Sequence, residues 1–90
     1  MDDLERLKKK LLKDPEFKKL YDESRIEFEI ARAVIRARIE RGLTQKQLAD
    51  KLHTRQSVIS RVEGANTTPS LSFLKRLAAV LNTTLQVQFK

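Results

Sequence analysis

Four polar side chains in the second half of the chain have the types and spacing to hydrogen-bond with the edges of DNA bases. They fall on the outer face of a short helix predicted from about residue 56 to 63, and they are Gln56, Ser57, Ser60 and Arg61. None of the four is acidic, and each can donate or accept a hydrogen bond in a major groove. The opposite face of this helix is apolar, so we expect the polar face to be free.

The only histidine, His53, lies just before this helix, in a break from Leu52 to Arg55, and it is the first residue to consider for catalysis. A Ser–His–acid set is not credible with one histidine placed in a turn. Glu27 and Glu29 stand beside arginines on a helix surface and are expected to form ion pairs. We therefore expect no enzyme activity. His53 is interpreted as a turn residue, because histidine tolerates a left-handed backbone better than most side chains.

Two short helices, one on each side of the break, must position the polar face. Thr44 is the predicted cap of the first helix, and Gln47, three residues later, completes a capping-box pattern. Leu48 and Leu52 are expected to face inward. Ala49 supplies the small side chain that a close crossing of two helices requires. The stretch therefore predicts a helix-turn-helix, in which the break sets the angle between the two helices.

The remaining elements are also predicted to be helices. Apolar residues recur at steps of three or four up to about residue 41, with an expected interruption near residues 22–25. Residues with the chemistry to begin or end helices fall at the right places: Asp14, Pro15, Gly42, Ser70 and Asn82. The chain is therefore predicted to be all-α, with five or so helices.

The last eight residues have a different period. Three apolar side chains alternate with polar ones, which is a strand pattern, and they are Leu85, Val87 and Phe89. One strand is not stable alone, and the chain offers no second strand. We therefore expect these three residues to pair with the same segment of a second copy in a homodimer. The alternative is a frayed tail.

Composition restricts the possible partners. The 90 residues carry a formal net charge of +7, and no cysteine is present. Residues 1–41 hold 12 basic and 10 acidic side chains, whereas residues 42–90 hold 7 basic and 2 acidic ones. The excess favours a polyanionic partner, although a basic surface without a nucleic-acid role is the alternative. We expect no metal site, no cofactor, no membrane span and a cytoplasmic location.

The helix-turn-helix segment resembles the Xre/phage-repressor family over about residues 30–81. The resemblance rests on QKQLADKLHTRQSVISRVEGANTTPSLSFLKRLAAVLN, preceded by RARIERGLT. The matching positions are Gln45, Leu48, Ala49, Leu52, Ile59, Val62, Glu63 and Pro69. The resemblance implies a lambda-repressor-like core that binds double-stranded operator DNA and represses transcription.

The resemblance also implies roles for individual residues. Gln56 and Ser57 would stand at the start of the recognition helix, where Gln56 can bind adenine through two hydrogen bonds. Ser60 and Arg61 share that face, and Arg61 would reach guanine or a phosphate. Backbone phosphates would be contacted by Thr44, Gln45, Arg55, Asn66 and Thr67. For each of these residues the alternative is a solvated polar side chain.

The chain departs from the family at three positions. The family usually has glycine where His53 stands, and serine or threonine where Arg55 stands, so Thr54 is a candidate cap instead. It usually has glycine at the position of Ala65, whereas this chain has Gly64 one residue earlier. These departures concern the geometry of the loops and leave the fold expectation unchanged.

The N-terminal segment resembles one branch of that family, the HigA-type antitoxins, which have a lead-in helix, a DPEF turn and a long helix before the motif. This resemblance implies a RelE/HigB-like RNase toxin as partner and autoregulation of the operon. The implied toxin-facing residues are Leu4, Leu7, Leu11, Phe17, Leu20 and Tyr21. Alternatively, these residues complete the core or the dimer, or residues 4–13 lie on an anionic membrane.

We therefore expect three regions: an extension over residues 1–27, a DNA-binding domain over residues 28–82 and a C-terminal strand over residues 83–90. The favoured function is a DNA-binding antitoxin that represses its own operon as a homodimer. A stand-alone Xre-family regulator without a toxin is the first alternative. A protein-interaction adaptor that has lost DNA binding is the second.

Overall fold

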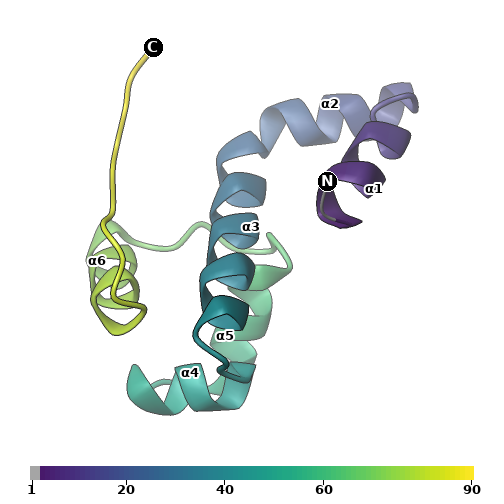
Figure 1. Cartoon of the computed structure of the whole chain (residues 1–90). Coiled ribbons are helices and arrows are strands. Elements are labelled where there is room, and N and C mark those ends of the chain that lie inside the picture. The colour runs from purple at the N-terminus through teal and green to yellow at the C-terminus, as the bar shows by residue number, and fades with distance from the viewer. Residues whose placement is uncertain (1–2) are drawn as a thin grey trace.

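A computed structural model describes residues 3–90, and these residues form six α-helices and no strand. The helices are α1 (Asp3–Leu11), α2 (Pro15–Glu23), α3 (Arg25–Glu40), α4 (Gln45–Lys51), α5 (Gln56–Glu63) and α6 (Leu71–Val80). Figure 1 shows α3 in the centre, with α1 and α2 at its N-terminal end and α4 at its C-terminal end. The predicted all-α class is confirmed. Residues 1 and 2 of the predicted extension lie outside the described part.

The predicted helix starts are confirmed by their capping hydrogen bonds. The Asp14 side chain accepts from the backbone N–H of Glu16, and Pro15 begins α2. Thr44 accepts from Gln47 N–H at 3.0 Å, and the Gln47 side chain accepts from Thr44 N–H at 2.9 Å. The Ser70 hydroxyl oxygen accepts from the backbone N–H of Phe73 at 3.0 Å and so caps α6. Since each cap satisfies backbone donors that the first helical turn leaves unpaired, these side chains determine where the helices begin.

Four residues just after helix ends have a left-handed backbone. Their φ angles are +68° at Gly42, +55° at His53, +57° at Ala65 and +54° at Asn82. The left-handed backbone predicted for His53 is confirmed, and Gly42 and Asn82, which were predicted to end helices, share this conformation. Ala65 takes a conformation that glycine adopts more readily than alanine. Alanine in this conformation costs roughly 1–2 kcal/mol.

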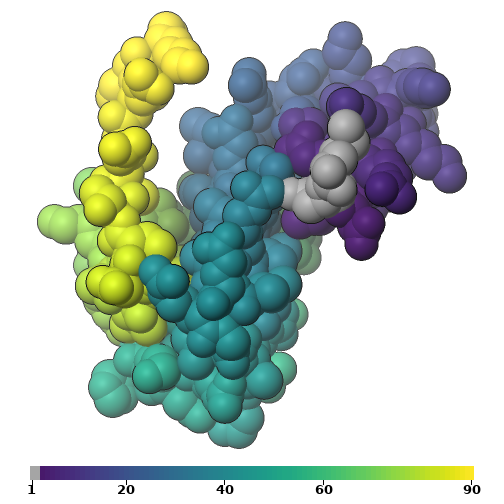
Figure 2. Space-filling view, viewed as in Figure 1, coloured from purple at the N-terminus to yellow at the C-terminus, as the bar shows by residue number. Residues whose placement is uncertain are grey.

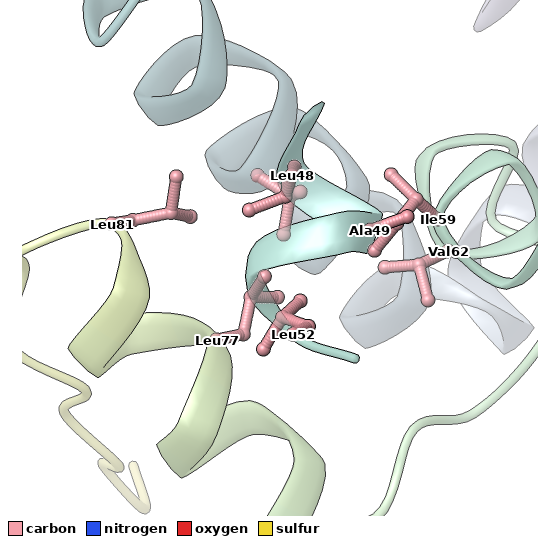
Figure 3. Close-up of a cluster of buried hydrophobic side chains, with 8 residues drawn as sticks. Leu48, Ala49, Leu52, Ile59, Val62, Leu77 and Leu81 are labelled. Atoms are coloured by element: carbon pink, nitrogen blue, oxygen red, sulfur yellow. The ribbon is translucent and has the colours of Figure 1, made fainter. Parts of the chain in front are cut away.

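The core lies where α3, α4, α5 and α6 meet. Its buried side chains are Val34, Leu48, Ala49, Leu52, Ile59, Val62, Leu77 and Leu81. In Figure 3, Ala49 lies beside Ile59 and Val62, while Leu52 lies beside Leu77. The small side chain of Ala49 therefore stands where α4 packs on α5, as the sequence predicts.

The extension packs on α3 through aromatic and charged groups. The ring of Tyr21 stacks on those of Phe17 and Phe28, with centroids 6.2 and 5.2 Å apart, and the rings of Phe17 and Phe28 are tilted relative to each other at 6.2 Å. Glu5 of α1 pairs with Arg32 of α3 at 2.8 Å. Neither α1 nor α2 contributes a buried residue. The predicted boundary at residues 27 and 28 falls inside α3, so the extension continues into the core along one helix.

The predicted C-terminal strand is not supported. After α6 the chain runs extended and away from the helices (Figure 1), without strand pairing among residues 3–90. Leu85, Val87 and Phe89 are exposed, and Phe89 has 96% of its surface accessible. The physical reason is that a β-ladder requires a second strand, which a single copy of this all-helical chain does not provide.

Candidate nucleic-acid interface

The α4–turn–α5 unit is built around two buried anchors on α4 and two on α5. Leu48 and Ile59 are fully buried, and Ala49 and Val62 are buried beside them. The turn is closed by a hydrogen bond from the Thr54 N–H to the Ala49 carbonyl at 2.9 Å. With its inner face packed in this way, α5 can present only its outer face to a ligand.

The outer face of α5 holds the four residues predicted to contact bases. Gln56, Ser57, Ser60 and Arg61 are all exposed, and they lie within the first six residues of one helix. None of their side chains is hydrogen-bonded to another described residue, so their donors and acceptors remain available to a ligand. The only carboxylate on α5, that of Glu63, is turned into the protein, where it accepts bonds from Arg38 and Gln45. The exposed face is therefore neutral to basic, which suits a polyanion.

Two residues beside α5 are predicted to contact phosphates. Arg55 is the N-cap residue of α5, but its side chain makes no capping bond and is exposed. Thr54 is not at the cap position, so the expected replacement cap is wrong. Thr44 is exposed at the start of α4, and its hydroxyl oxygen accepts the capping bond from Gln47. Arg55 is thus free to reach a phosphate, while Thr44 also orders the amides at the start of α4.

Gln45, the third predicted phosphate contact, belongs to a network that sequence reasoning missed. Its Nε2 donates to Glu63 Oε1 at 3.1 Å, and Arg38 donates to both Glu63 oxygens at 2.6 and 3.0 Å. Arg38 Nη1 also donates to the Leu43 carbonyl at 2.8 Å. One carboxylate therefore joins α3, α4 and α5. A usable signal in the sequence was Glu63 itself, because it is one of only two acids in the basic half.

The network is well enclosed. The side chains of Arg38 and Glu63 are 15% and 5% exposed. Hydrogen bonding to Glu63 raises the pKa of Arg38 above its ordinary value, with a smaller opposing effect from burial. Because the pKa of Arg38 is higher in the folded chain than in the unfolded chain, its pairing stabilises the fold at every pH below the unfolded-state pKa. This stabilisation is lost only as the pH rises through the folded-state pKa. The guanidinium therefore stays charged under all ordinary conditions.

The loop after α5 holds the last two predicted phosphate contacts. Asn66 is exposed and Thr67 is half-buried. The neighbouring Thr68 donates to the Glu27 carboxylate at 2.9 Å. Glu27 is thus bonded to a hydroxyl, whereas Glu29 forms the expected ion pair with Arg25 at 3.1 Å. A carboxylate beside this loop makes it a weaker phosphate site than the start of α5.

A groove of about 640 Å³ lies between the extension and the end of α5. Five of the six predicted toxin-facing residues line it: Leu4, Leu7, Leu11, Phe17 and Tyr21. The sixth, Leu20, is exposed outside the groove. Glu63, Gly64 and Ala65 line it from the α5 side. The structure therefore brings most of the predicted set together, next to the helix predicted to read DNA.

A second hollow, of about 460 Å³, lies between α6 and the C-terminal segment. It is lined by Leu71, Lys75, Ala78, Ala79, Thr83, Thr84, Leu85 and Val87. Two of the three predicted dimer residues therefore lie beside the outer face of α6. Phe89 lies beyond the hollow, and in Figure 2 the end of the segment stands clear of the helices.

A helix-turn-helix family model matches residues 34–88, which is more than half of the chain. The chain belongs to the helix-turn-helix family. Within it, the chain is similar to a Yarrowia lipolytica protein named multi-protein-binding factor 1, at 32% identity over 62 residues. It is also similar to an uncharacterised HTH-type transcriptional regulator of Haemophilus influenzae, at 34% identity over 65 residues.

These two alignments cover 69% and 72% of this chain, but only 41% and 66% of the two relatives. No solved structure matches the chain at a significant level. No helix within residues 3–90 has the length and apolar character needed to cross a membrane. Membership of the helix-turn-helix family, together with the exposed outer face of α5, supports DNA binding as the activity of the α4–α5 unit.

Proposed function

We propose that this protein is a sequence-specific transcriptional repressor that binds operator DNA as a homodimer and acts as the antitoxin of a toxin–antitoxin pair. The observation that carries the DNA-binding part is the outer face of α5. Its four polar residues are exposed and unbonded, and its only acid is turned inward. The face belongs to the half of the chain with 7 basic and 2 acidic residues. It therefore meets both the steric and the electrostatic requirements of major-groove reading.

Each contact has a distinct task in this proposal. Gln56 and Ser57, in the first turn of α5, read base edges, and Ser60 and Arg61 extend that reading by one turn. Arg55, together with the capped start of α4, holds the backbone and sets the register. The loop residues Asn66 and Thr67 add weaker backbone contacts.

The homodimer is supported by the apolar C-terminal segment. Leu85, Val87 and Phe89 are exposed, and the hollow that Leu85 and Val87 line is formed mainly by small or apolar side chains of α6. Covering these side chains with the same surface of a second copy gives a two-fold arrangement. A two-fold dimer would place its recognition helices in half-sites about 34 Å apart.

The antitoxin part is supported by the extension. Its apolar side chains line an open groove, while the helix-turn-helix core is complete without α1. The near balance of charge in residues 1–41 permits a basic toxin, which residues 42–90 would repel. The Yarrowia relative, named for binding several proteins, is consistent with a helix-turn-helix chain that also has protein partners.

The test uses the DNA upstream of the gene and the product of any small, basic open reading frame beside it. We expect tight, salt-dependent binding of this DNA at two half-sites, together with inhibition of RNA cleavage by the neighbouring product. Operator binding without a neighbouring toxin would establish the stand-alone regulator instead. Absence of salt-dependent binding to this DNA would contradict the repressor and favour the adaptor.

A further inference from the structure

The turn of the helix-turn-helix begins at Leu52. This residue is the C-cap of α4, and α5 begins shortly after it at Gln56. Between the two, His53 has a left-handed backbone with φ at +55°. Because a backbone of this kind persists only where the surrounding structure holds it, the direction of α5 depends on how firmly Leu52 is fixed.

Helix α6 holds both the side chain and the backbone of Leu52. The Leu52 side chain is 2% exposed and lies beside Leu77 of α6 in Figure 3. Arg76, the residue before Leu77, donates from Nη2 to the Leu52 carbonyl oxygen at 2.5 Å. Within residues 3–90 this carbonyl receives no other hydrogen bond. Two consecutive residues of α6 therefore fasten the residue that begins the turn.

An arginine suits the carbonyl at the end of α4. The last carbonyls of a helix have no partner within that helix, and the helix dipole gives this end a partial negative charge. A guanidinium stays positively charged at every ordinary pH and forms stronger hydrogen bonds than a neutral donor does. Arg76 thus satisfies an acceptor that the turn itself leaves open, and it does so from a helix that carries none of the predicted base-contacting residues.

We propose that Arg76 is a positioning residue for DNA reading, which directs Gln56 into the major groove by fixing the Leu52 carbonyl. The inference rests on the proposed function, because it needs an operator that α5 reads. The buried side chains of α4 and α5 keep the two helices together, and the Arg76 bond restricts the turn that sets their angle. A small shift of this turn is costly, since hydrogen bonds to base edges weaken steeply when they are misaligned.

A phosphate contact is the competing role for Arg76. Because its side chain is exposed, the guanidinium is also open to the DNA backbone. Such a contact carries no sequence information, so its removal weakens binding to operator and unrelated DNA alike and lowers the salt slope by about 1. The positioning role predicts instead a loss confined to the operator, with an unchanged salt slope.

The test compares three variants for binding to the upstream DNA and to unrelated DNA of equal length. Arg76→Met removes the charge and the donor but keeps a long stem, whereas Arg76→Lys keeps the charge and a donor. The matched control is Arg41→Met. Arg41 also donates to helix-end carbonyls, but these belong to Leu81 and Asn82 at the end of α6 rather than to the turn.

We expect Arg76→Met to bind the operator about 10-fold more weakly, which lies within the cost of one misplaced base contact, and to bind unrelated DNA as before. Arg76→Lys should recover most of the operator affinity. Arg41→Met should leave the ratio of the two affinities unchanged, even where its melting temperature falls as far. An equal loss on both DNAs, or an equal fall of the ratio in Arg41→Met, overturns the proposal.

Repeating Arg76→Met in the Gln56→Ala background tests whether Arg76 acts through Gln56. If it does, the two losses do not add, and the further loss of operator affinity should be less than about 3-fold. A loss as large as in the original background contradicts the positioning role. Arg76→Ala, which removes the same donor and has the highest helix propensity, replaces Arg76→Met if thermal melting shows that the methionine variant does not fold.

The unmutated protein is measured first. If it does not bind the upstream DNA specifically, the proposed function fails, and this inference fails with it. If it binds and Arg76→Met binds equally well, only the positioning role fails.

Discussion

The helix-turn-helix core and the N-terminal extension carry similar leucine stripes but differ in what covers them. Leu48 on α4 is 0% exposed, whereas Leu7 on α1 is 52% exposed. The core packs four helices around its stripes. In the extension, α1 lies against its neighbours through the Glu5–Arg32 ion pair and a cation–π contact from Lys8 to Tyr21.

An apolar repeat in the sequence therefore shows which face of a helix is apolar, but it does not show whether another element covers that face. In the core, the faces of α3, α4, α5 and α6 converge, so burial supplies the stability. In the extension, exposed apolar side chains remain on an open groove. Since monomers seldom leave a large apolar surface uncovered, the extension is the better candidate for a partner surface.

Deleting residues 1–13 is the most severe test of whether the core and the extension act independently. This deletion removes α1, which buries no residue, so the core should still fold and bind operator DNA. Binding to the proposed toxin should be abolished, as measured by recovery of that protein's RNA cleavage. If the shortened protein still neutralises the toxin, the extension has only a structural role.

A second test compares one leucine from each region. Leu48→Ala should lower the free energy of unfolding by about 2–5 kcal/mol, because it leaves a cavity in a packed core. Leu7→Ala should cost less than about 1 kcal/mol, because half of the side chain is already in water. Urea denaturation measures both. Equal costs would show that the extension is part of one cooperative core.

A third test asks whether DNA reading belongs to the core alone. Gln56→Ala should weaken binding to the specific operator by roughly 1–3 kcal/mol without changing the thermal melting temperature. Its affinity for unrelated DNA should stay the same, since no charge is removed. The matched variant Arg55→Ala should weaken binding to both DNAs and reduce the salt slope by about 1. Unchanged operator affinity in Gln56→Ala would remove that residue from its assigned role.

The smallest effects are expected at the left-handed turns of the core. Ala65→Gly should raise the free energy of unfolding by less than about 1 kcal/mol, since relief of the left-handed strain is partly offset by the flexibility of glycine. His53→Gly should be neutral or slightly stabilising, because histidine tolerates this conformation better than alanine does. A large loss of DNA binding in a folded His53→Gly would indicate that the imidazole contacts a phosphate.

Much of the local structure was predictable because it depends on neighbours in the chain. The caps at Asp14, Thr44 and Ser70 each bond to backbone two or three residues away. The break at Ser24 and the left-handed His53 likewise follow from local sequence. The error at the C-terminus has the opposite cause, because the alternation of Leu85, Val87 and Phe89 has no partner strand within the chain.

The features of the candidate site were likewise predictable only where they depend on the local sequence. The exposure of Gln56 and Arg61 followed from the apolar period of their own helix. The bond between Gln45 and Glu63 joins residues 18 positions apart, and that between Arg38 and Glu63 joins residues 25 apart. No local pattern brings such pairs together, since their distance depends on how three helices cross.

The helices, their caps and the polar face of α5 thus follow from the order of residues alone, because they depend on periods and bonds within a few residues. Which leucines are covered, which partners Glu63 bonds with and how the extension meets the end of α5 at a groove depend instead on the folded arrangement. Those features depend on packing between distant segments, where burial and enclosed hydrogen bonds, rather than local preference, select the arrangement.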